Sequence, residues 1–226
     1  MAMFFVYSPQ LRADIEATLS VDRLAVFRQA AAGDLERAID LYCWNAAMAA
    51  AFFGPLGIME VGLRNALDRE LIRAFTVPWY DDPKFLAIDS AFAPRIYDTK
   101  KKITARGKAV VQPRVIAELS FGFWVNLLRP GPGGSYVHTL WGPALSRAFR
   151  PRVKRSFVAG CLDPLLKFRN RVAHHEPIFS RNLGEQYASI LWIIGQVAPN
   201  IVSWVQHHAR VNEGITNGPC PPKTRW

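Results

Sequence analysis

Apolar side chains recur along most of the chain at intervals of three or four residues, the spacing that places them on one face of a helix. The clearest example is PLGIMEVGLRNALDRELIRAF, in which Leu56, Met59 and Leu63 begin a long apolar stripe. Strict alternation of apolar and polar residues, which would indicate strands, is nearly absent. The pattern therefore predicts an all-α protein.

Residues suited to helix ends divide this pattern into segments. Ser20 and Asp34 each precede a helical segment and can cap it, and Gly33 is a natural stop between the two. Gly54-Pro55 is expected either to end the helix that follows Asp34 or to kink it.

Four further helical segments are expected after a loop rich in proline, aspartate and aromatic residues. They cover residues 91–106, a helix starting at Pro113, a basic segment ending before Pro177 that Pro164 can split, and residues 183–207 with an interruption near Pro199.

A chain of 226 residues is expected to form one domain. We assign residues 1–211 to a single helical domain, with residues 1–19 as an N-terminal extension, and residues 212–226 to a flexible tail. Half of the residues are apolar, which is enough for a packed core and excludes a mostly disordered protein.

Compartment is predicted from the cysteines and from the apolar stretches. Cys43, Cys161 and Cys220 are an odd number at wide spacing, which makes a disulfide framework or a zinc finger improbable. The first residues lack the pattern of a signal peptide, and the apolar run Ala46–Ile58 is better suited to a buried helix than to a membrane span. We expect a cytoplasmic protein with no membrane partner.

Charge is distributed unevenly. The chain has 28 Lys and Arg against 18 Asp and Glu, a net charge of +10. Residues 1–90 carry −4 and residues 91–226 carry +14. A field of this kind favours polyanionic partners such as nucleic acid or an anionic membrane surface.

The densest polar segment is KFRNRVAHHEP, which closes the basic helix. On a helix, Asn170 and His174 are four residues apart and share a face, and Arg169 lies close to them. An arginine can grip a phosphate through two hydrogen bonds, and a histidine can transfer protons beside it. These groups suffice for metal-free RNA cleavage, in which the ribose 2′-hydroxyl attacks the adjacent phosphorus. DNA lacks that hydroxyl.

Arg169-Asn170, three intervening residues and His174 resemble the motif of HEPN ribonucleases, in which histidine follows arginine by four to six residues. The longer segment RNRVAHHEPIF is similar to the corresponding helix end of Abi-like (abortive infection) proteins, a HEPN branch. Two further segments, WNAAMAAAFFGPLGIMEVGLRNALDREL and ELSFGFWVNLL, resemble the same branch, so the likeness runs from about Ser20 to Trp204.

The resemblance implies an all-α, HEPN-like helical bundle with additional helices, and a homodimer in which two copies of the motif meet in one cleft. It also implies a metal-independent endoribonuclease without a cofactor, acting in phage defence or as a toxin held by an RNA or protein antitoxin. Arg169 would bind the scissile phosphate, Asn170 would orient the site and His174 would transfer protons, with His175 as the alternative to His174. Some HEPN toxins are silenced by nucleotide transfer to a tyrosine two residues beyond the motif histidine, where this chain has Glu176.

Basic and polar side chains around the motif and along the second part of the chain are the expected RNA contacts. They are Lys167, Arg171, Arg64, Asn65, Lys100, Lys101, Lys102, Arg152, Lys154 and Arg155. Arg64 has an alternative, because Glu60, Arg64 and Asp68 follow at four-residue spacing and can form an exposed ion-pair ladder.

Other residues are weaker candidates for a functional role. Trp79 and Tyr80 are expected to be exposed and to be the best places for base stacking, His138 to be packed, and His207-His208 to lie on the surface. Seven aromatic residues at helical spacing are assigned to the core or a dimer interface: Trp44, Phe52, Phe53, Phe123, Trp124, Trp192 and Trp204. The sequence contains no Walker loop, dinucleotide-binding turn or nucleophile elbow.

Two functions remain as alternatives to the endoribonuclease. One is a non-catalytic RNA-binding protein that holds a structured RNA on the same basic surface. The other is a protein-interaction module whose role is to dimerise.

Overall fold

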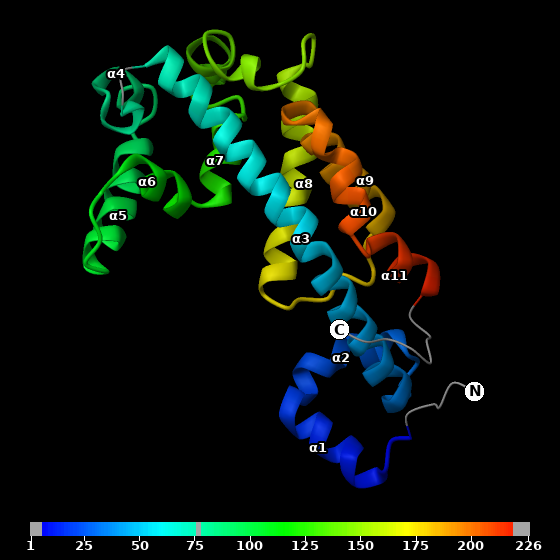
Figure 1. Ribbon diagram of the computed structural model, residues 1–226. Coiled ribbons are helices and arrows are strands. Elements are labelled where there is room, and N and C mark those ends of the chain that lie inside the picture. Colours follow the sequence, from blue (N-terminus) through cyan, green and yellow to red (C-terminus); the bar gives the residue numbers. More distant parts are fainter. Residues whose placement is uncertain (1–5, 76–77, 219–226) are drawn as a thin grey trace. The chain divides into compact units, whose positions relative to one another are not determined.

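A computed structural model describes residues 6–75 and 78–218 of the chain, and within these ranges all regular structure is helical (Figure 1). The predicted all-α class is therefore confirmed. The longer elements in chain order are α1 (Pro9–Leu19), α2 (Val21–Ala30), α3 (Leu35–Ala74), α4 (Pro83–Leu86), α5 (Phe92–Ala105), α6 (Gln112–Glu118), α7 (Phe121–Leu127), α8 (Arg155–Ala173), α9 (Leu183–Val197), α10 (Val202–His208) and α11 (Val211–Asn217).

The contacts divide the chain into two compact units. Unit 1 consists of the described residues within 1–56, 168–188 and 205–226, and unit 2 of those within 57–167 and 189–204. Helices α3, α8 and α9 each contribute residues to both units. The single domain expected over residues 1–211 stays a prediction.

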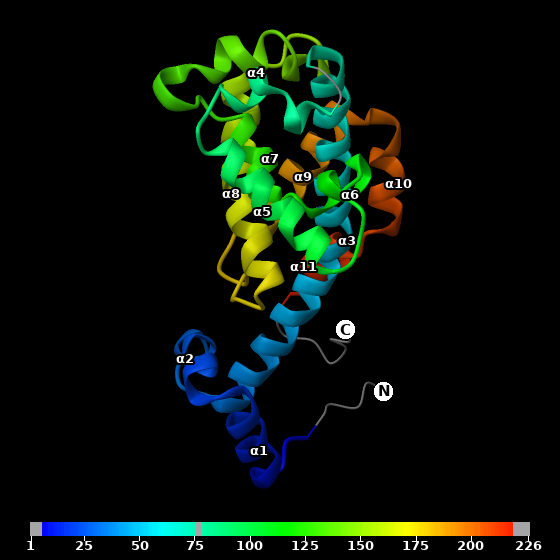
Figure 2. The ribbon, with the colours of Figure 1, turned by 90° about the vertical axis from the view of Figure 1, so that its left-hand side faces the viewer.

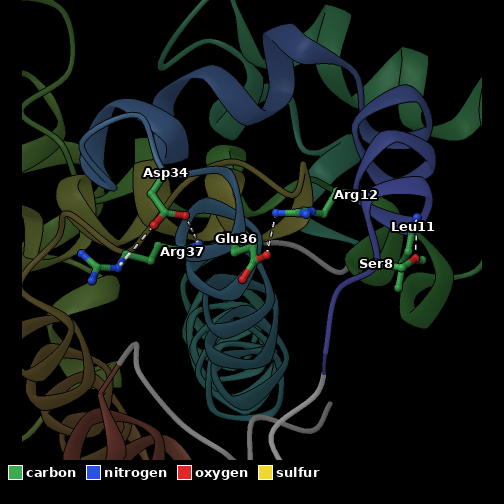
Figure 3. Close-up of polar contacts among 6 residues, drawn as sticks. All are labelled: Ser8, Leu11, Arg12, Asp34, Glu36 and Arg37. Atoms are coloured by element: carbon green, nitrogen blue, oxygen red, sulfur yellow. Dashed lines mark hydrogen bonds and ion pairs between the residues drawn. The ribbon is translucent and has the colours of Figure 1, made fainter.

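The first helices of unit 1 begin at side-chain caps (Figure 3). The Ser8 hydroxyl accepts a hydrogen bond from the Leu11 N–H at 3.1 Å, and Asp34 accepts one from the Arg37 N–H at 3.1 Å. Arg12 of α1 pairs with Glu36 in the first turn of α3 at 2.6 Å, which ties these two helices together. Ser20 caps α2 as predicted, through the Arg23 N–H at 3.2 Å. Helices α1 and α2 contact each other, as both ribbon views show (Figures 1 and 2).

Helix α3 continues through Gly54-Pro55, so of the two expected outcomes, an end or a kink, the end does not occur. A proline inside a helix costs about 3 kcal/mol through a lost hydrogen bond and a steric clash. Phe52, Leu56 and Met59 are all fully or almost fully buried on either side of it. Because burying each such side chain contributes about 1.5–3 kcal/mol, packing outweighs the local cost.

Aromatic rings fill the core of unit 1. Phe52 of α3 meets Phe168 of α8 edge to face, with ring centroids 4.8 Å apart. Phe27 of α2 packs against Tyr42 and Phe179, each at 5.2 Å. These contacts hold the end of α8 and the segment that follows it against α2 and α3.

The predicted flexible tail is wrong for its first residues, which form α11. Val211 is fully buried, and the Trp44 indole donates a hydrogen bond to the Gly214 carbonyl at 3.1 Å. This contact joins residues 170 positions apart, and local sequence does not disclose it.

Residues 219–226, including Cys220, lie outside the described part of the chain. Cys43 and Cys161 are free thiols.

Unit 2 has its own aromatic core, built on a short 3-10 turn at Trp79–Asp81 together with α4, α5 and α7. Trp79 and Tyr80 are buried, so their predicted exposure is wrong. Trp79 packs against Phe85 with ring centroids 4.7 Å apart, and its indole donates to Asp68 at 2.7 Å. The Gln112 amide also donates to the Asp68 carboxylate at 3.3 Å, so Asp68 holds the core of unit 2 through two donors.

The single helix expected from Pro113 is two helices, α6 and α7. Leu119 adopts an extended conformation after α6, and the Ser120 hydroxyl accepts from the Phe123 N–H at 3.2 Å, so that it caps α7. The Ser120 cap lies within a continuous apolar pattern, which explains why the pattern alone predicted one helix instead of α6 and α7. Short helical turns at Pro132–Gly134, Val137–Trp141 and Leu145–Ala148 then lead to α8.

Most of the aromatic residues assigned to the core are buried, but Phe53 is 72% exposed and Trp204 is 53% exposed. His138 is exposed rather than packed, because Leu140 takes the buried position of its turn. His207 and His208 lie on the surface as expected.

Helix α3 is long and apolar enough to cross a membrane by length and composition. In its most apolar window, 39% of the residues are buried inside the protein. Core helices and membrane spans both have this composition, and the aromatic contacts of Phe52 place this part of α3 in the core of unit 1.

Candidate functional site

The segment with the ribonuclease-like motif forms the last turn of α8 and the turn that follows it. In unit 1, Phe168 and Val172 are buried on the inner face of α8, and Asn170, midway between them, lies on the opposite, outward face. Asn170 and His174 are exposed, and Arg169 is half-buried. Arg169 and Asn170 thus lie in the last turn of α8, and His174 follows directly after its last residue, Ala173.

A pair of backbone hydrogen bonds closes the helix. The Glu176 N–H donates to the Arg171 carbonyl at 2.8 Å, and the His175 N–H donates to the Val172 carbonyl at 3.3 Å. This is the Schellman arrangement, in which the residue after the cap adopts left-handed backbone angles. Here that residue is His175, with φ of +56°, although glycine is the usual occupant. His174 and His175 therefore leave the helix in different directions.

Arg171 holds the turn rather than facing outward. Its Nη1 donates to the Pro177 carbonyl at 3.1 Å and lies 3.7 Å from a carboxylate oxygen of Glu176. The side chain that we expected to contact RNA is thus engaged with the turn that presents the two histidines.

Two residues that the sequence analysis did not single out, one in α2 and one in α3, form hydrogen bonds with the turn after α8 and the segment that follows it. Arg23 donates from Nη1 to the His175 carbonyl at 2.7 Å. Asn45, only 3% exposed, accepts hydrogen bonds from the Ile178 N–H at 2.7 Å and the Phe179 N–H at 3.1 Å. Asn45 is the one amide in the largely apolar stretch 41–59 of α3, and this is the signal that could have identified it, because a buried amide needs partners.

The remaining RNA-contact candidates belong to unit 2. Lys100 pairs with Asp81 and lies 5.0 Å from the centre of the Tyr80 ring, and Arg155 donates to the Leu128 carbonyl at 3.0 Å. Both side chains therefore already contact other residues of unit 2.

Other candidates in this unit are open to solvent. Exposed are Asn65, Lys101, Lys102, Arg152, Lys154 and Lys167. Arg64 is half-buried, and its Nε is buried without a hydrogen-bond partner among the described residues.

The two units differ in net charge. Unit 2 has 18 Lys and Arg against 9 Asp and Glu, a net charge of +9, whereas the described residues of unit 1 have 8 against 9, a net charge of −1. The motif thus lies in the nearly neutral unit, and the positive field that attracts polyanions originates in the other.

Comparison with known proteins gives no match to a family model, a curated protein or a solved structure. Within residues 6–75 and 78–218, no group of three or more His, Cys, Asp or Glu side chains is placed to hold a metal ion. The chemistry of the site is therefore argued from the α8 helix end alone.

Proposed function

We propose that the protein is a metal-independent endoribonuclease of the HEPN type, with Arg169, Asn170 and His174 as its catalytic residues. The supporting observation is that the two polar groups Asn170 and His174 are exposed on a helix end whose following turn is fixed by Arg171, Arg23 and Asn45. A fixed turn keeps a proton-transfer group in place without a cost of ordering it during the reaction.

The reaction requires few groups. His174 removes the proton of the ribose 2′-hydroxyl, the 2′-oxygen forms a bond to phosphorus, and the bond from phosphorus to the 5′-oxygen breaks. A second proton is delivered to the leaving 5′-oxygen, which gives a 2′,3′-cyclic phosphate and a 5′-hydroxyl. Arg169 stabilises the charge on the phosphoryl oxygens, and Asn170 orients them.

A homodimer would supply the second proton-transfer group. Two copies of the motif in one cleft provide two imidazoles, one to accept a proton and one to donate it. The net charge of +9 on unit 2, including the exposed Lys101, Lys102 and Lys154, supports binding of the RNA backbone. In the cell we propose a cytoplasmic role in phage defence or as a toxin restrained by an RNA or protein antitoxin.

The same charge supports a second candidate, a non-catalytic protein that holds a structured RNA. Arg and Lys contacts to phosphates do not depend on His174, so binding can exist without cleavage.

Purified full-length protein incubated with single-stranded and structured RNA in excess EDTA tests the proposal. We expect cleavage that leaves cyclic-phosphate ends, no cleavage of DNA of the same sequence, and loss of activity in Arg169→Ala and His174→Ala. Arg181→Ala is the matched control, because Arg181 is an exposed arginine of the same unit outside the motif.

Salt-sensitive RNA binding without cleavage would overturn the enzyme proposal in favour of the RNA-holding protein. If neither binding nor cleavage occurs, the dimeric interaction module is favoured. Sedimentation analysis measures the dimer independently of activity.

A further inference from the structure

A pocket of about 290 Å³ opens in unit 2 where α5 begins. Its walls come from the first turn of α5, from Asn126 near the end of α7 and from the proline- and glycine-rich loop that starts at Arg129. The side chains that can contact a ligand there by charge are Asp89, Arg95 and Arg129. None of them belongs to the α8 helix end.

Hydrogen-bond donors in this pocket exceed the acceptors available to them. Arg129 uses Nε and Nη2 on Asp163, at 2.8 and 2.7 Å, and Nη1 on the Asn126 side-chain oxygen at 2.7 Å. A guanidinium has five N–H donors, so two remain. Arg95 is exposed, and its side chain makes no hydrogen bond or close ion pair among the described residues, although its positive charge acts on the Asp89 carboxylate.

The one acidic side chain that lines the pocket, Asp89, already accepts two hydrogen bonds. One oxygen of Asp89 accepts from the Ala91 N–H at 2.7 Å, and the other accepts from the Tyr136 hydroxyl. The Tyr136 hydrogen bond is the main cause that lowers the pKa of Asp89, so this carboxylate stays ionised and bound to its two donors. Asp89 is thus the single carboxylate that lines the pocket, against the two guanidinium groups of Arg95 and Arg129.

Helix α5 begins at this pocket, where the Ala91 N–H donates to the Asp89 carboxylate at 2.7 Å and the Phe92 N–H donates to the Asp89 main-chain carbonyl at 3.0 Å. It is 14 residues long, and Ala91, Phe92 and Arg95 of its cap and first turn all line the pocket. The N-terminal end of a helix carries partial positive charge that favours anions. Together with the guanidinium of Arg95 and the remaining donors of Arg129, this makes an acceptor-rich anion the ligand that fits.

We propose that this pocket binds the phosphoryl group of a nucleotide, either a free mononucleotide or the terminal phosphate of an RNA strand. A phosphate offers several acceptor oxygens to the two guanidinium groups. Sites for small molecules run from about 300 to 1,000 Å³, so a volume at the lower end suits a phosphate with one attached nucleoside rather than a longer strand. The apolar rings of Pro130 and Pro132 line the remaining wall.

Titration calorimetry of the full-length protein with adenosine 5′-monophosphate, inorganic phosphate and adenosine tests the proposal. We expect the monophosphate to bind and adenosine not to bind. Arg95→Gln should weaken binding about tenfold, since it removes charge-assisted hydrogen bonds. Asp89→Asn should strengthen it, because a negative charge leaves the site. Arg69→Gln, which changes an exposed arginine of unit 2 outside the pocket, should leave it unchanged.

A second arm separates the two sources of phosphate. A short RNA with a 5′-monophosphate is compared with the same RNA carrying a 5′-hydroxyl. If the phosphorylated RNA binds more tightly and Arg95→Gln removes the difference, the ligand is a strand end; if only the free mononucleotide depends on Arg95, the ligand is the mononucleotide.

The proposal is overturned if phosphorylated probes bind no better than adenosine or the 5′-hydroxyl RNA, or if Arg95→Gln and Arg69→Gln weaken binding equally. Its failure is distinguishable from failure of the ribonuclease. Arg95→Gln should retain cleavage of 5′-hydroxyl RNA, and Arg169→Ala should retain binding of the monophosphate.

Discussion

The guanidinium of Arg23 donates a hydrogen bond of 2.7 Å to the main-chain carbonyl of His175, a residue 152 positions later in the chain. The bond reaches the one position of the turn that has left-handed backbone angles, with φ of +56°. Arg23 thus binds the backbone of the turn and not its imidazole, so substitution of the His175 side chain leaves this contact possible. The geometry separates the structural role of position 175 from the chemical role of its side chain.

His175→Gly should raise the free energy of unfolding by about 1 kcal/mol, because glycine adopts left-handed backbone angles without the steric cost that a side chain adds. Urea denaturation of the variant against the wild type measures the change. His174→Gly is the comparison: φ at position 174 is not positive, and glycine there should destabilise the protein by about 0.5–1 kcal/mol.

The same two variants separate the histidines in the cleavage assay. His174→Gly should abolish cleavage, and His175→Gly should reduce it less. If His175→Gly reduces cleavage more than His174→Gly does, His175 is the residue that transfers the proton.

Asn45→Leu should lower the free energy of unfolding by about 2–4 kcal/mol, since two backbone N–H groups at Ile178 and Phe179 lose their acceptor. Asn65→Leu is the matched control on the same helix. Asn65 is exposed, so we expect a change within about 0.5 kcal/mol. Equal effects in denaturation experiments would show that the two hydrogen bonds of Asn45 contribute nothing.

Gly131→Ala and Gly133→Ala form a second matched pair. Both glycines have positive φ, +73° and +57°, so each alanine carries a backbone cost of about 1–2 kcal/mol. A Cβ on Gly131 would also lie 2.1 Å from the Tyr136 ring, whereas one on Gly133 meets nothing within 4 Å. Gly131→Ala should therefore destabilise the protein by about 1–3 kcal/mol more, as thermal or urea unfolding can measure. A smaller loss for Gly131→Ala would contradict this packing.

Tyr136→Phe should lower stability in a manner that depends on pH. The Tyr136 hydroxyl lowers the pKa of Asp89, so the ionised carboxylate stabilises the folded state above the ordinary pKa of aspartate, near 4. This contribution is lost as pH falls through the lower pKa of the folded protein.

Burial and the hydrogen bond to Asp89 raise the pKa of Tyr136, so on the alkaline side the contribution persists until the ordinary tyrosine range, near 10, is passed. Urea denaturation at pH 7 should give a difference between wild type and Tyr136→Phe of about 1.5–3 kcal/mol, and the difference should shrink as the pH is lowered below 4. A difference that stays constant into the acid range would rule out this coupling.

Local sequence predicted much of the secondary structure because helix ends depend on a few neighbouring residues. Ser20 and Asp34 cap helices through N–H groups three residues away, and the apolar spacing of α3 and α8 matches their buried faces. The motif at the end of α8 was found for the same reason, since its residues are separated by at most five positions.

The contacts that were missed join distant segments. Trp79 packs against Phe123 and Trp124, α11 forms against Trp44, and Asn45 reaches the backbone after Pro177. None of these partners is identified by the residues next to them. Helix α3 passes through Pro55 for the same reason: the apolar contacts on both sides outweigh a local cost that sequence alone detects.

The amino-acid sequence by itself determined the all-α class, the helix caps and the placement of arginine, amide and histidine at one helix end, because each depends on spacing within a few residues. Only the tertiary structure decided which polar side chains are engaged in anchoring and which remain open, as Arg171 and Lys102 illustrate. Burial and hydrogen-bond partners arise when segments far apart in the chain pack together, and that information is carried by no single stretch of it.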